Sequence, residues 1–326
     1  MSAVGNLKWG LVGYGDLAAR RSTAALQTAA GSELAGVWGR QPARTLEFAA
    51  KHRIPRAHDS LASLLASGID AVYVCTPADS HAEYALAAIA AGKHVLVEKP
   101  MADALPDCEA MVKSARERGV TLGVAYYRRA YPKMRKIREL IAGGILGTPT
   151  WVNISNHSWY NPAAGDPKHW RVEKARSGGA GALADIGVHR LDLLDYWLGP
   201  SRVAFSDLHN LVHHYEVEDG ASIVLKLEGG APAHAYFSWN SKAFSDRFEI
   251  TGSEGKLIAD PLDGPLLVVI RGQEREELRI DPPTNAHLPC VEDFVQAVRE
   301  GRAPLCSGED GLRTSRVLAQ ILSGPK

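Results

Sequence analysis

The first third of the chain alternates short apolar runs with longer segments of mixed polarity. Most of these runs are apolar on both faces, which is typical of parallel strands covered by helices on either side. The segments between them have helical spacing, and several end at a glycine. The predicted strands are residues 7–12, 33–38, 70–75, 93–98 and 120–125. Repeated strand–helix units predict an α/β domain with a doubly wound parallel sheet.

The pattern changes after residues 147–149, where longer strands replace the strand–helix alternation. Glycine-rich turns separate them, which indicates antiparallel pairing. The predicted strands are residues 151–155, 221–228, 233–240 and 247–251. A second domain of α+β type follows, so we predict domains over residues 1–126 and 127–326. Helices predicted near 291–299 and 310–322 could pack against either domain.

Composition and charge exclude several classes of protein. The chain has 326 residues, 37 Lys and Arg against 37 Asp and Glu, and therefore a formal net charge of zero. Without a basic surplus we expect no nucleic-acid partner, and without a long apolar run we expect no membrane segment. The first residues lack the pattern of a signal peptide. The four cysteines form no CxxC pair, so a reduced, cytoplasmic setting is expected.

A glycine-rich turn follows the first predicted strand. It is the GxGxxA sequence Gly13, Tyr14, Gly15, Asp16, Leu17, Ala18. In a dinucleotide fingerprint the first glycine permits the tight turn, the second lets the backbone approach a pyrophosphate, and the small third residue packs helix on strand. Its place between strand and helix predicts a dinucleotide-binding site.

The end of the second predicted strand bears on which dinucleotide binds. An NAD enzyme usually has a carboxylate there for the ribose hydroxyls. This chain has Gly39, then Arg40, with Arg44 one turn later. Guanidinium groups bind a 2′-phosphate, so NADP(H) is favoured and NAD(H) remains possible. The alternative is that both arginines are solvated charges at a helix start.

A charged pair ends the strand 93–98. Ligands of doubly wound sheets bind beyond the carboxyl ends of the strands, where Glu98 and Lys99 lie. The preceding strand ends at Thr76 and Pro77, with His81 one turn on, so these side chains are expected at the same crevice. The alternative is an ordinary surface Glu–Lys pair.

The second half concentrates its candidate chemistry in a glycine-rich segment and the helix after it. Asp185, His189 and Asp192 have the spacing of one helix face. An acid and an imidazole one turn apart can relay a proton or bind a metal, but no third ligand has a convincing spacing, so no metal is expected. The alternative is a polar surface face. The basic run 128–138 is interpreted as a solvated helix face rather than a nucleic-acid patch.

Three elements occur together in this order: GxGxxA, Glu98-Lys99-Pro100, and a glycine-rich segment with Asp185 and His189. Together they resemble the Gfo/Idh/MocA oxidoreductase family, the glucose–fructose oxidoreductase and myo-inositol dehydrogenase group. The resemblance extends from Trp9 to about Leu318. It implies a Rossmann domain, a C-terminal domain with an open, mostly antiparallel sheet, and hydride transfer between a nicotinamide and a sugar, polyol or related carbonyl compound.

The resemblance also implies roles for individual residues. Lys99 resembles the catalytic lysine that binds the reacting oxygen, His189 the general acid/base, and Asp185 the carboxylate that binds hydroxyls or supports the relay. The Lys99–Pro100 bond is often cis in relatives. Further substrate-binding positions implied in the same way are Arg128, Trp170 and Arg171. Asp79 stands where relatives often have Asn, and its effect is left open.

Two other functions share these residues. One is a redox-assisted glycosidase that couples transient oxidation to elimination, and the other is a non-catalytic protein that senses the cofactor. The resemblance further implies a homodimer or homotetramer that pairs through the C-terminal sheet. The sequence gives neither the substrate nor the direction of the reaction.

Overall fold

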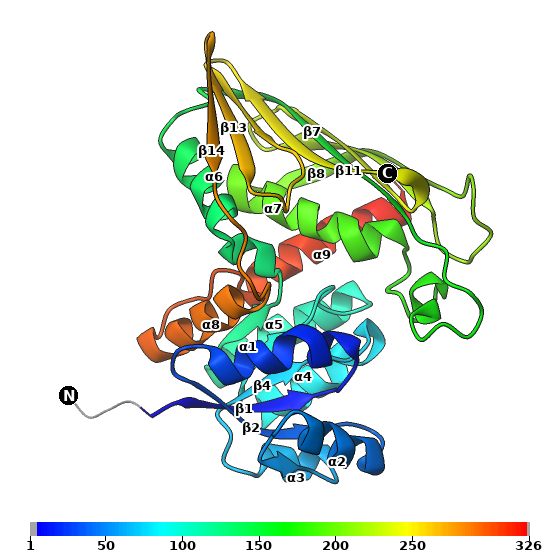
Figure 1. Cartoon of the computed structure of the whole chain (residues 1–326), viewed down its shortest axis with the longest axis vertical. Helices are drawn as coiled ribbons and strands as arrows, with labels where there is room; N and C mark the ends of the chain where they lie inside the picture. Colours follow the sequence, from blue (N-terminus) through cyan, green and yellow to red (C-terminus); the bar gives the residue numbers. More distant parts are fainter. Residues whose placement is uncertain (1–4, 325–326) are drawn as a thin grey trace. The chain divides into compact units, whose positions relative to one another are not determined.

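The computed structural model describes residues 5–324, which form two compact units (Figure 1). The first unit runs to Ala130 and includes the later segment Pro283–Leu312. The second consists of Tyr131–Pro282 and the chain from Arg313. The single boundary predicted near Tyr126 does not include this return of the chain, which crosses between the units at three places.

The first unit is built on a six-stranded parallel sheet with the order β3-β2-β1-β4-β5-β6. This order reverses direction between β1 and β4, which is the switch point where doubly wound sheets bind ligands. The doubly wound fold is therefore confirmed. The strands are β1 (Leu7–Val12), β2 (Ser32–Trp38), β3 (Arg56–Ala57), β4 (Ala71–Val74), β5 (His94–Val97) and β6 (Leu122–Val124).

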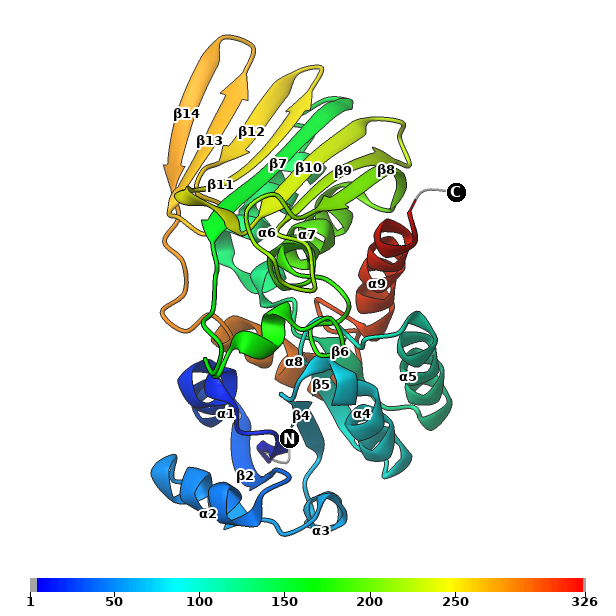
Figure 2. The same cartoon turned by 90° about the vertical axis from the view of Figure 1, so that its right-hand side faces the viewer.

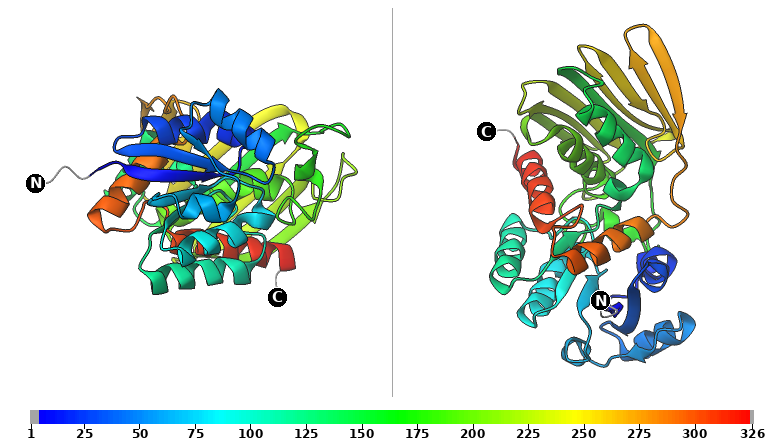
Figure 3. Two further views of the ribbon diagram at one scale, coloured as in Figure 1. Left: turned by 90° about the horizontal axis from the view of Figure 1, so that it is seen from below. Right: turned by 90° about the vertical axis from the view of Figure 1, so that its left-hand side faces the viewer.

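Helices cover both faces of this sheet (Figure 3). One face packs on a core that includes Trp9, Leu26, Phe48 and Phe294, with the Trp9 and Phe294 rings 5.2 Å apart. That face carries α1 (Thr23–Thr28), α2 (Pro42–Lys51) and α8 (Leu288–Glu300). The other carries α3 (Leu61–Leu65), α4 (His81–Ala90) and α5 (Leu105–Arg118). The predicted helix 291–299 thus belongs to the first unit.

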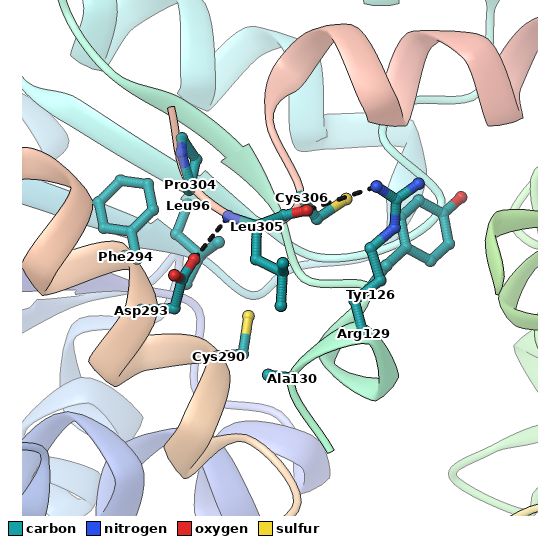
Figure 4. Close-up of a pocket in the computed structure, with 10 residues that line it drawn as sticks. All are labelled: Leu96, Tyr126, Arg129, Ala130, Cys290, Asp293, Phe294, Pro304, Leu305 and Cys306. Carbon is teal, nitrogen blue, oxygen red and sulfur yellow. Dashed lines mark hydrogen bonds between the residues drawn. The ribbon is translucent and has the colours of Figure 1, made fainter. Parts of the chain in front are cut away.

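The returning segment is tied to β5, β6 and the residues after them (Figure 4). The Asp293 carboxylate accepts the Leu305 N–H at 2.5 Å, and Val124 donates to the Cys306 carbonyl at 3.1 Å. The Arg129 guanidinium, 3% exposed, lies 3.1 Å from the Asp310 carboxylate. These contacts add an outer layer to the edge of the parallel sheet.

The second unit has an eight-stranded mixed sheet with the order β14-β13-β12-β11-β7-β10-β9-β8 (Figure 2). Only β7 and β10 pair in parallel, so the expected mostly antiparallel sheet is confirmed. The strands are β7 (Pro149–Trp159), β8 (Ser201–His209), β9 (Gly220–Leu227), β10 (Pro232–Ser238), β11 (Asn240–Gly252), β12 (Gly255–Ala259), β13 (Leu266–Arg271) and β14 (Glu274–Arg279). The sequence pattern did not predict β8, β12, β13 or β14.

Two helices of the second unit, α6 (Pro132–Ala142) and α7 (Val188–Leu198), pack on each other and on the sheet. Trp197 of α7 donates from Nε1 to the Met134 carbonyl at 3.0 Å, and its ring lies 4.8 Å from Phe248 of β11. A π-helical turn over Leu183–Gly187 precedes α7. The last helix, α9 (Gly308–Ser323), begins in the first unit and ends in the second.

The basic run 128–138 differs from the prediction of a solvated helix face. Arg135 and Arg138 are exposed, but Arg129 and Lys133 are buried at 2% and 4% exposure. The Lys133 ammonium donates to three backbone carbonyls in residues 261–266, and Arg129 is paired with Asp310. Hydrogen-bond partners from distant segments make burial of these two cations possible.

A second buried ion pair fixes α7 to the sheet. Arg190 of α7 donates to the Asp246 carboxylate of β11 at 2.6 Å, and both side chains are 4% exposed. Asn156 of β7 donates to the same carboxylate at 3.0 Å. Because water cannot replace these partners, removing one leaves a buried charge without compensation.

We therefore expect Asp246→Ala to destabilise the protein by about 3–5 kcal/mol, the cost of breaking a buried pair. Asp281→Ala is the matched control, because Asp281 pairs with Arg279 at 3.1 Å while both are 68% exposed. The control should cost less than about 1 kcal/mol. Urea unfolding at neutral pH measures both, and equal losses would contradict the role given to the Asp246 pair.

Candidate cofactor and catalytic site

The turn after β1 has the geometry that its two glycines were predicted to provide. Gly13 has φ +98°, and a Cβ there would lie 2.6 Å from the Cys75 carbonyl oxygen, so only glycine fits. A Cβ on Gly15 would meet no atom within 4 Å. The backbone at Gly15 is therefore open to a ligand, and this cradle fits a dinucleotide pyrophosphate.

The residues after this turn start the helix differently from the prediction. Ala18 is fully buried, as a small packing residue should be, but residues Ala18–Ser22 form a π-helical turn before α1 begins. Asp16 is exposed and forms an ion pair with Arg20. Leu17 is half-buried and packs against the core of the unit.

The end of β2 brings together a tyrosine and two arginines. A Cβ on Gly39 would lie 2.0 Å from the Tyr14 ring, so the absence of a side chain at position 39 lets the ring pack there. The Arg44 guanidinium lies 5.4 Å from the centre of that ring. Arg40 and Arg44 are exposed, and position 39 offers no carboxylate. Tyr14 was not predicted as a site residue, although it lies inside the glycine turn.

The strands β4 and β5 end beside each other, as their parallel pairing requires. Thr76 and Pro77 follow β4, and Lys99 follows β5 with a half-buried side chain. The Lys99–Pro100 peptide bond is cis, as the resemblance implied. Asp79 is exposed near this edge. The pKa of Asp103 is raised mainly by burial of Asp103 and, to a smaller extent, by the charge of Asp79.

His81 joins the two strand ends. It is 1% exposed, with Nε2 2.8 Å from the Thr76 carbonyl oxygen and Nδ1 2.9 Å from the Pro100 carbonyl oxygen. Burial lowers the pKa of His81, while both carbonyl groups and the Glu98 carboxylate oppose that shift. His81 thereby connects Thr76, beyond the end of β4, to Pro100, which follows Lys99.

The Glu98 carboxylate lies in the interior at 3% exposure. Its Oε1 accepts the Tyr73 hydroxyl at 2.5 Å and lies 3.2 Å from His287 Nε2, and its Oε2 accepts the Lys99 N–H at 3.2 Å. Burial raises the pKa of Glu98, but these partners and the Lys99 charge outweigh burial, so the pKa falls below its usual value. The sequence did not indicate Tyr73 or His287, because no local pattern links them to Glu98.

In the second unit, the structure brings together Trp170, Arg171 and Asp185. The Arg171 guanidinium donates to the Asp185 carboxylate at 3.2 Å and lies 5.6 Å from the centre of the Trp170 ring. Asp185 and Arg171 are each about one third exposed, at 29% and 33%. Asp185 belongs to the π-helical turn, so its spacing to His189 is not that of a regular α-helix.

His189 and Asp192 lie on α7 and are 4% and 0% exposed. The alternative interpretation of the triplet as a polar surface face is therefore wrong for these two. The arginine between them, Arg190, is also buried. Helix α7 therefore carries several polar side chains within the protein.

Two adjacent acids hold the segments around this helix. The Glu218 carboxylate accepts the N–H groups of Gly181 and Leu183 at 2.8 and 2.9 Å, at the start of the π-helical turn. Burial raises the pKa of Glu218, although these two N–H groups favour its charged form. Asp219 accepts N–H groups from residues 211–213. No local sequence pattern indicated this pair.

Arg128 belongs to the first unit, where it donates to the Tyr127 hydroxyl at 2.9 Å and lies 5.0 Å from the ring centre. Within residues 5–324, no group of three His, Cys, Asp or Glu side chains could hold a metal ion. No helix in the same range is long and apolar enough to cross a membrane.

Comparisons with known proteins agree with this arrangement. Residues 7–126 match a family model described as the oxidoreductase family with NAD-binding Rossmann fold, and residues 134–258 match the GFO/IDH/MocA C-terminal domain. The chain is 33% identical over 312 residues to the 1,5-anhydro-D-fructose reductase of Ensifer adhaerens, covering 94% of this chain and 92% of that protein.

Solved structures of oxidoreductases are also similar to this chain over almost its whole length. A crystal structure of an oxidoreductase domain protein from Kribbella flavida is 30% identical with a TM-score of 0.88, over 98% of this chain and 96% of that one. A 3-ketoreductase from Actinomadura kijaniata, crystallised with NADP and TDP-benzene, is 27% identical with a TM-score of 0.84, over 98% of each chain.

The lowered pKa of His81 predicts how acid affects stability. The unfolded chain binds this proton near pH 6.5 and the folded protein only at lower pH, so the contribution of His81 to folding falls as pH drops below 6.5. The difference in unfolding free energy between wild type and His81→Gln should shrink from pH 7.5 to about pH 5. Urea titrations at several pH values measure it. A growing difference would mean that the two carbonyl groups stabilise an imidazolium.

Proposed function

The chain belongs to the Gfo/Idh/MocA family of NAD(P)-dependent oxidoreductases, and from that premise we propose that it transfers hydride between NADP(H) and a sugar, polyol or related carbonyl compound. Its relative from Ensifer adhaerens is named a 1,5-anhydro-D-fructose reductase. A carbonyl reductase of this kind is therefore the first form of the reaction to test.

One observation carries the proposal. Three neighbouring parallel strands, β1, β4 and β5, end at one edge of the first unit with the glycine cradle, Thr76 and Lys99 respectively. The switch point between β1 and β4 is where such sheets bind dinucleotides. A lysine on the next strand of the same edge is suited to act beside the reacting carbon of a bound nicotinamide.

Each proposed catalytic residue has a distinct task. The Lys99 ammonium stabilises the negative charge that develops on the substrate oxygen, and His189 supplies or removes the proton of the hydroxyl group. Asp185, oriented by Arg171, accepts hydrogen bonds from substrate hydroxyls. Trp170 and Arg128 also bind the substrate. When bound, the nicotinamide supplies the hydride chemistry.

The exposed arginines at the end of β2 support a preference for NADP(H). Arg40 and Arg44 can bind a 2′-phosphate, and the Tyr14 ring beneath Arg44 orients that guanidinium. The carboxylate that would repel the phosphate is absent at Gly39. The other proposed contacts to the dinucleotide are Gly13, Gly15, Asp16, Leu17, Ala18, Thr76, Pro77, His81, Glu98 and Lys99.

We propose a homodimer or homotetramer that assembles through the eight-stranded sheet. Large apolar side chains of that sheet are exposed, including Phe244 at 66% and Phe205 at 49%. A reducing compartment such as the cytoplasm fits the four cysteines, which are all free thiols.

The test is nicotinamide absorbance with purified protein, both cofactors, and a panel of sugars, polyols, their keto forms and glycosides. Turnover with one compound, and loss of about a hundredfold to a thousandfold in kcat for Lys99→Ala with cofactor affinity within about tenfold, would support the proposal. A glycoside cleaved without net change in absorbance would replace it with the redox-assisted glycosidase. Tight cofactor binding without turnover, unaffected by His189→Ala, would indicate a sensor.

The cofactor preference has its own test. Arg40→Ala removes a charge-assisted contact worth about 1.5–3 kcal/mol, so it should weaken NADPH binding roughly tenfold or more and leave NADH binding nearly unchanged. Titration of protein fluorescence with each cofactor measures both affinities. Arg53→Ala, a change at another arginine of the first unit, is the control. Equal weakening of both cofactors would contradict the NADP preference.

A further inference from the structure

His287, in the returning segment Pro283–Leu312, lies beside the carboxylate of Glu98, the residue before Lys99. His287 Nε2 lies 3.2 Å from Glu98 Oε1, and the two side chains are 1% and 4% exposed. His287 stands immediately before α8, far along the chain from β5. A buried carboxylate requires such partners, because its charge is otherwise strongly disfavoured in the interior.

The Glu98 carboxylate is in turn hydrogen-bonded to the backbone of Lys99. Strand β5 ends at Val97, so the peptide group between Glu98 and Lys99 is no longer part of the regular ladder. The Lys99 N–H instead donates to Glu98 Oε2 at 3.2 Å, while Oε1 accepts the Tyr73 hydroxyl at 2.5 Å and lies 3.2 Å from His287 Nε2. The position from which the lysine side chain departs therefore depends on where this carboxylate is held.

His287 is itself fixed by its surroundings in the first unit. Its backbone N–H donates to Asn285 Oδ1 at 2.9 Å, and the Asn285 side-chain amide donates in turn to the Arg21 carbonyl at 3.1 Å. The imidazole lies 4.5 Å from the Tyr127 ring. The backbone of His287 is therefore held by Asn285, and its ring is packed against Tyr127 beside Glu98.

We propose that His287 is a positioning residue for Lys99, acting through the Glu98 carboxylate. The proposal rests on the function above, because it takes Lys99 to be the group that meets the reacting oxygen. Without His287, Glu98 keeps fewer partners and shifts toward its uncharged form, which accepts the Lys99 N–H less strongly. The Lys99 backbone, from which the ammonium-bearing side chain extends, is then less firmly held. The glycine cradle for the cofactor is unaffected.

The experiment compares His287→Leu, His287→Gln and Lys99→Ala with the wild-type protein. Displacement of a catalytic group by about an ångström can cost a hundredfold, so His287→Leu should lower kcat by roughly tenfold to a hundredfold, with KM and the NADPH affinity within about threefold. His287→Gln keeps an N–H donor and should recover most of kcat. The matched control is His58→Gln, another buried histidine of this unit, which contacts Ser63 at 3.0 Å and should leave kcat unchanged.

A second readout does not depend on turnover. Hydrogen exchange of the Lys99 amide should quicken in His287→Leu, while the Val95 amide, which donates to the Thr121 carbonyl within the sheet, stays protected. Unchanged exchange at Lys99 would overturn the proposal, as would a kcat within twofold of wild type. A parallel loss of kcat, KM, cofactor affinity and melting temperature would also overturn it, since that shows only a structural role.

The same set of variants separates this proposal from the proposed function. If Lys99→Ala keeps its turnover, the catalytic role of the lysine fails and the positioning proposal fails with it. If Lys99→Ala is inactive and His287→Leu is fully active, the proposed function stands and only the role of His287 is rejected.

Discussion

The first unit depends on keeping one carboxylate charged in its interior. Glu98 is 3% exposed, and such a group stays ionised only where donors replace the lost water. Tyr73 of β4 is one donor and the neighbouring backbone N–H another, and the imidazole of His287, from the segment Pro283–Leu312, lies 3.2 Å from the same carboxylate. The return of the chain to the first unit thus supplies apolar packing through α8 and also the partner that this carboxylate requires.

The second unit contains three carboxylates that are likewise held by hydrogen-bond or ion-pair partners. Glu218 accepts two backbone N–H groups before the π-helical turn, Asp219 accepts those of an adjacent loop, and Asp246 pairs with Arg190. Apolar packing tolerates small sliding movements, whereas hydrogen bonds to carboxylates specify a direction. Polar contacts therefore fix the orientation of the helix that carries His189 more narrowly than its apolar residues could.

The sequence predicted those features that depend on local pattern. The alternation of strand and helix predicted the parallel sheet, and the glycine spacing predicted the cradle at Gly13 and Gly15. It failed where the outcome depends on distant partners, as for His287 with Glu98 and for Lys133 with the carbonyl groups of residues 261–266. Strand β14 was missed because all of its side chains but one are exposed and most are charged, which leaves no apolar alternation to detect.

If Asp185 binds the substrate as proposed, its pairing with Arg171 bears on what kind of substrate is accepted. The guanidinium already donates to one oxygen of this carboxylate, so the pair adds no net charge where the substrate would bind. An anionic substrate group would have to compete with Asp185 for Arg171 and would lie close to a carboxylate. A neutral hydroxyl group can instead donate to the remaining oxygen and keep the pair intact. The arrangement therefore favours a neutral, hydroxyl-rich molecule at Asp185, which is the chemistry of a sugar or polyol.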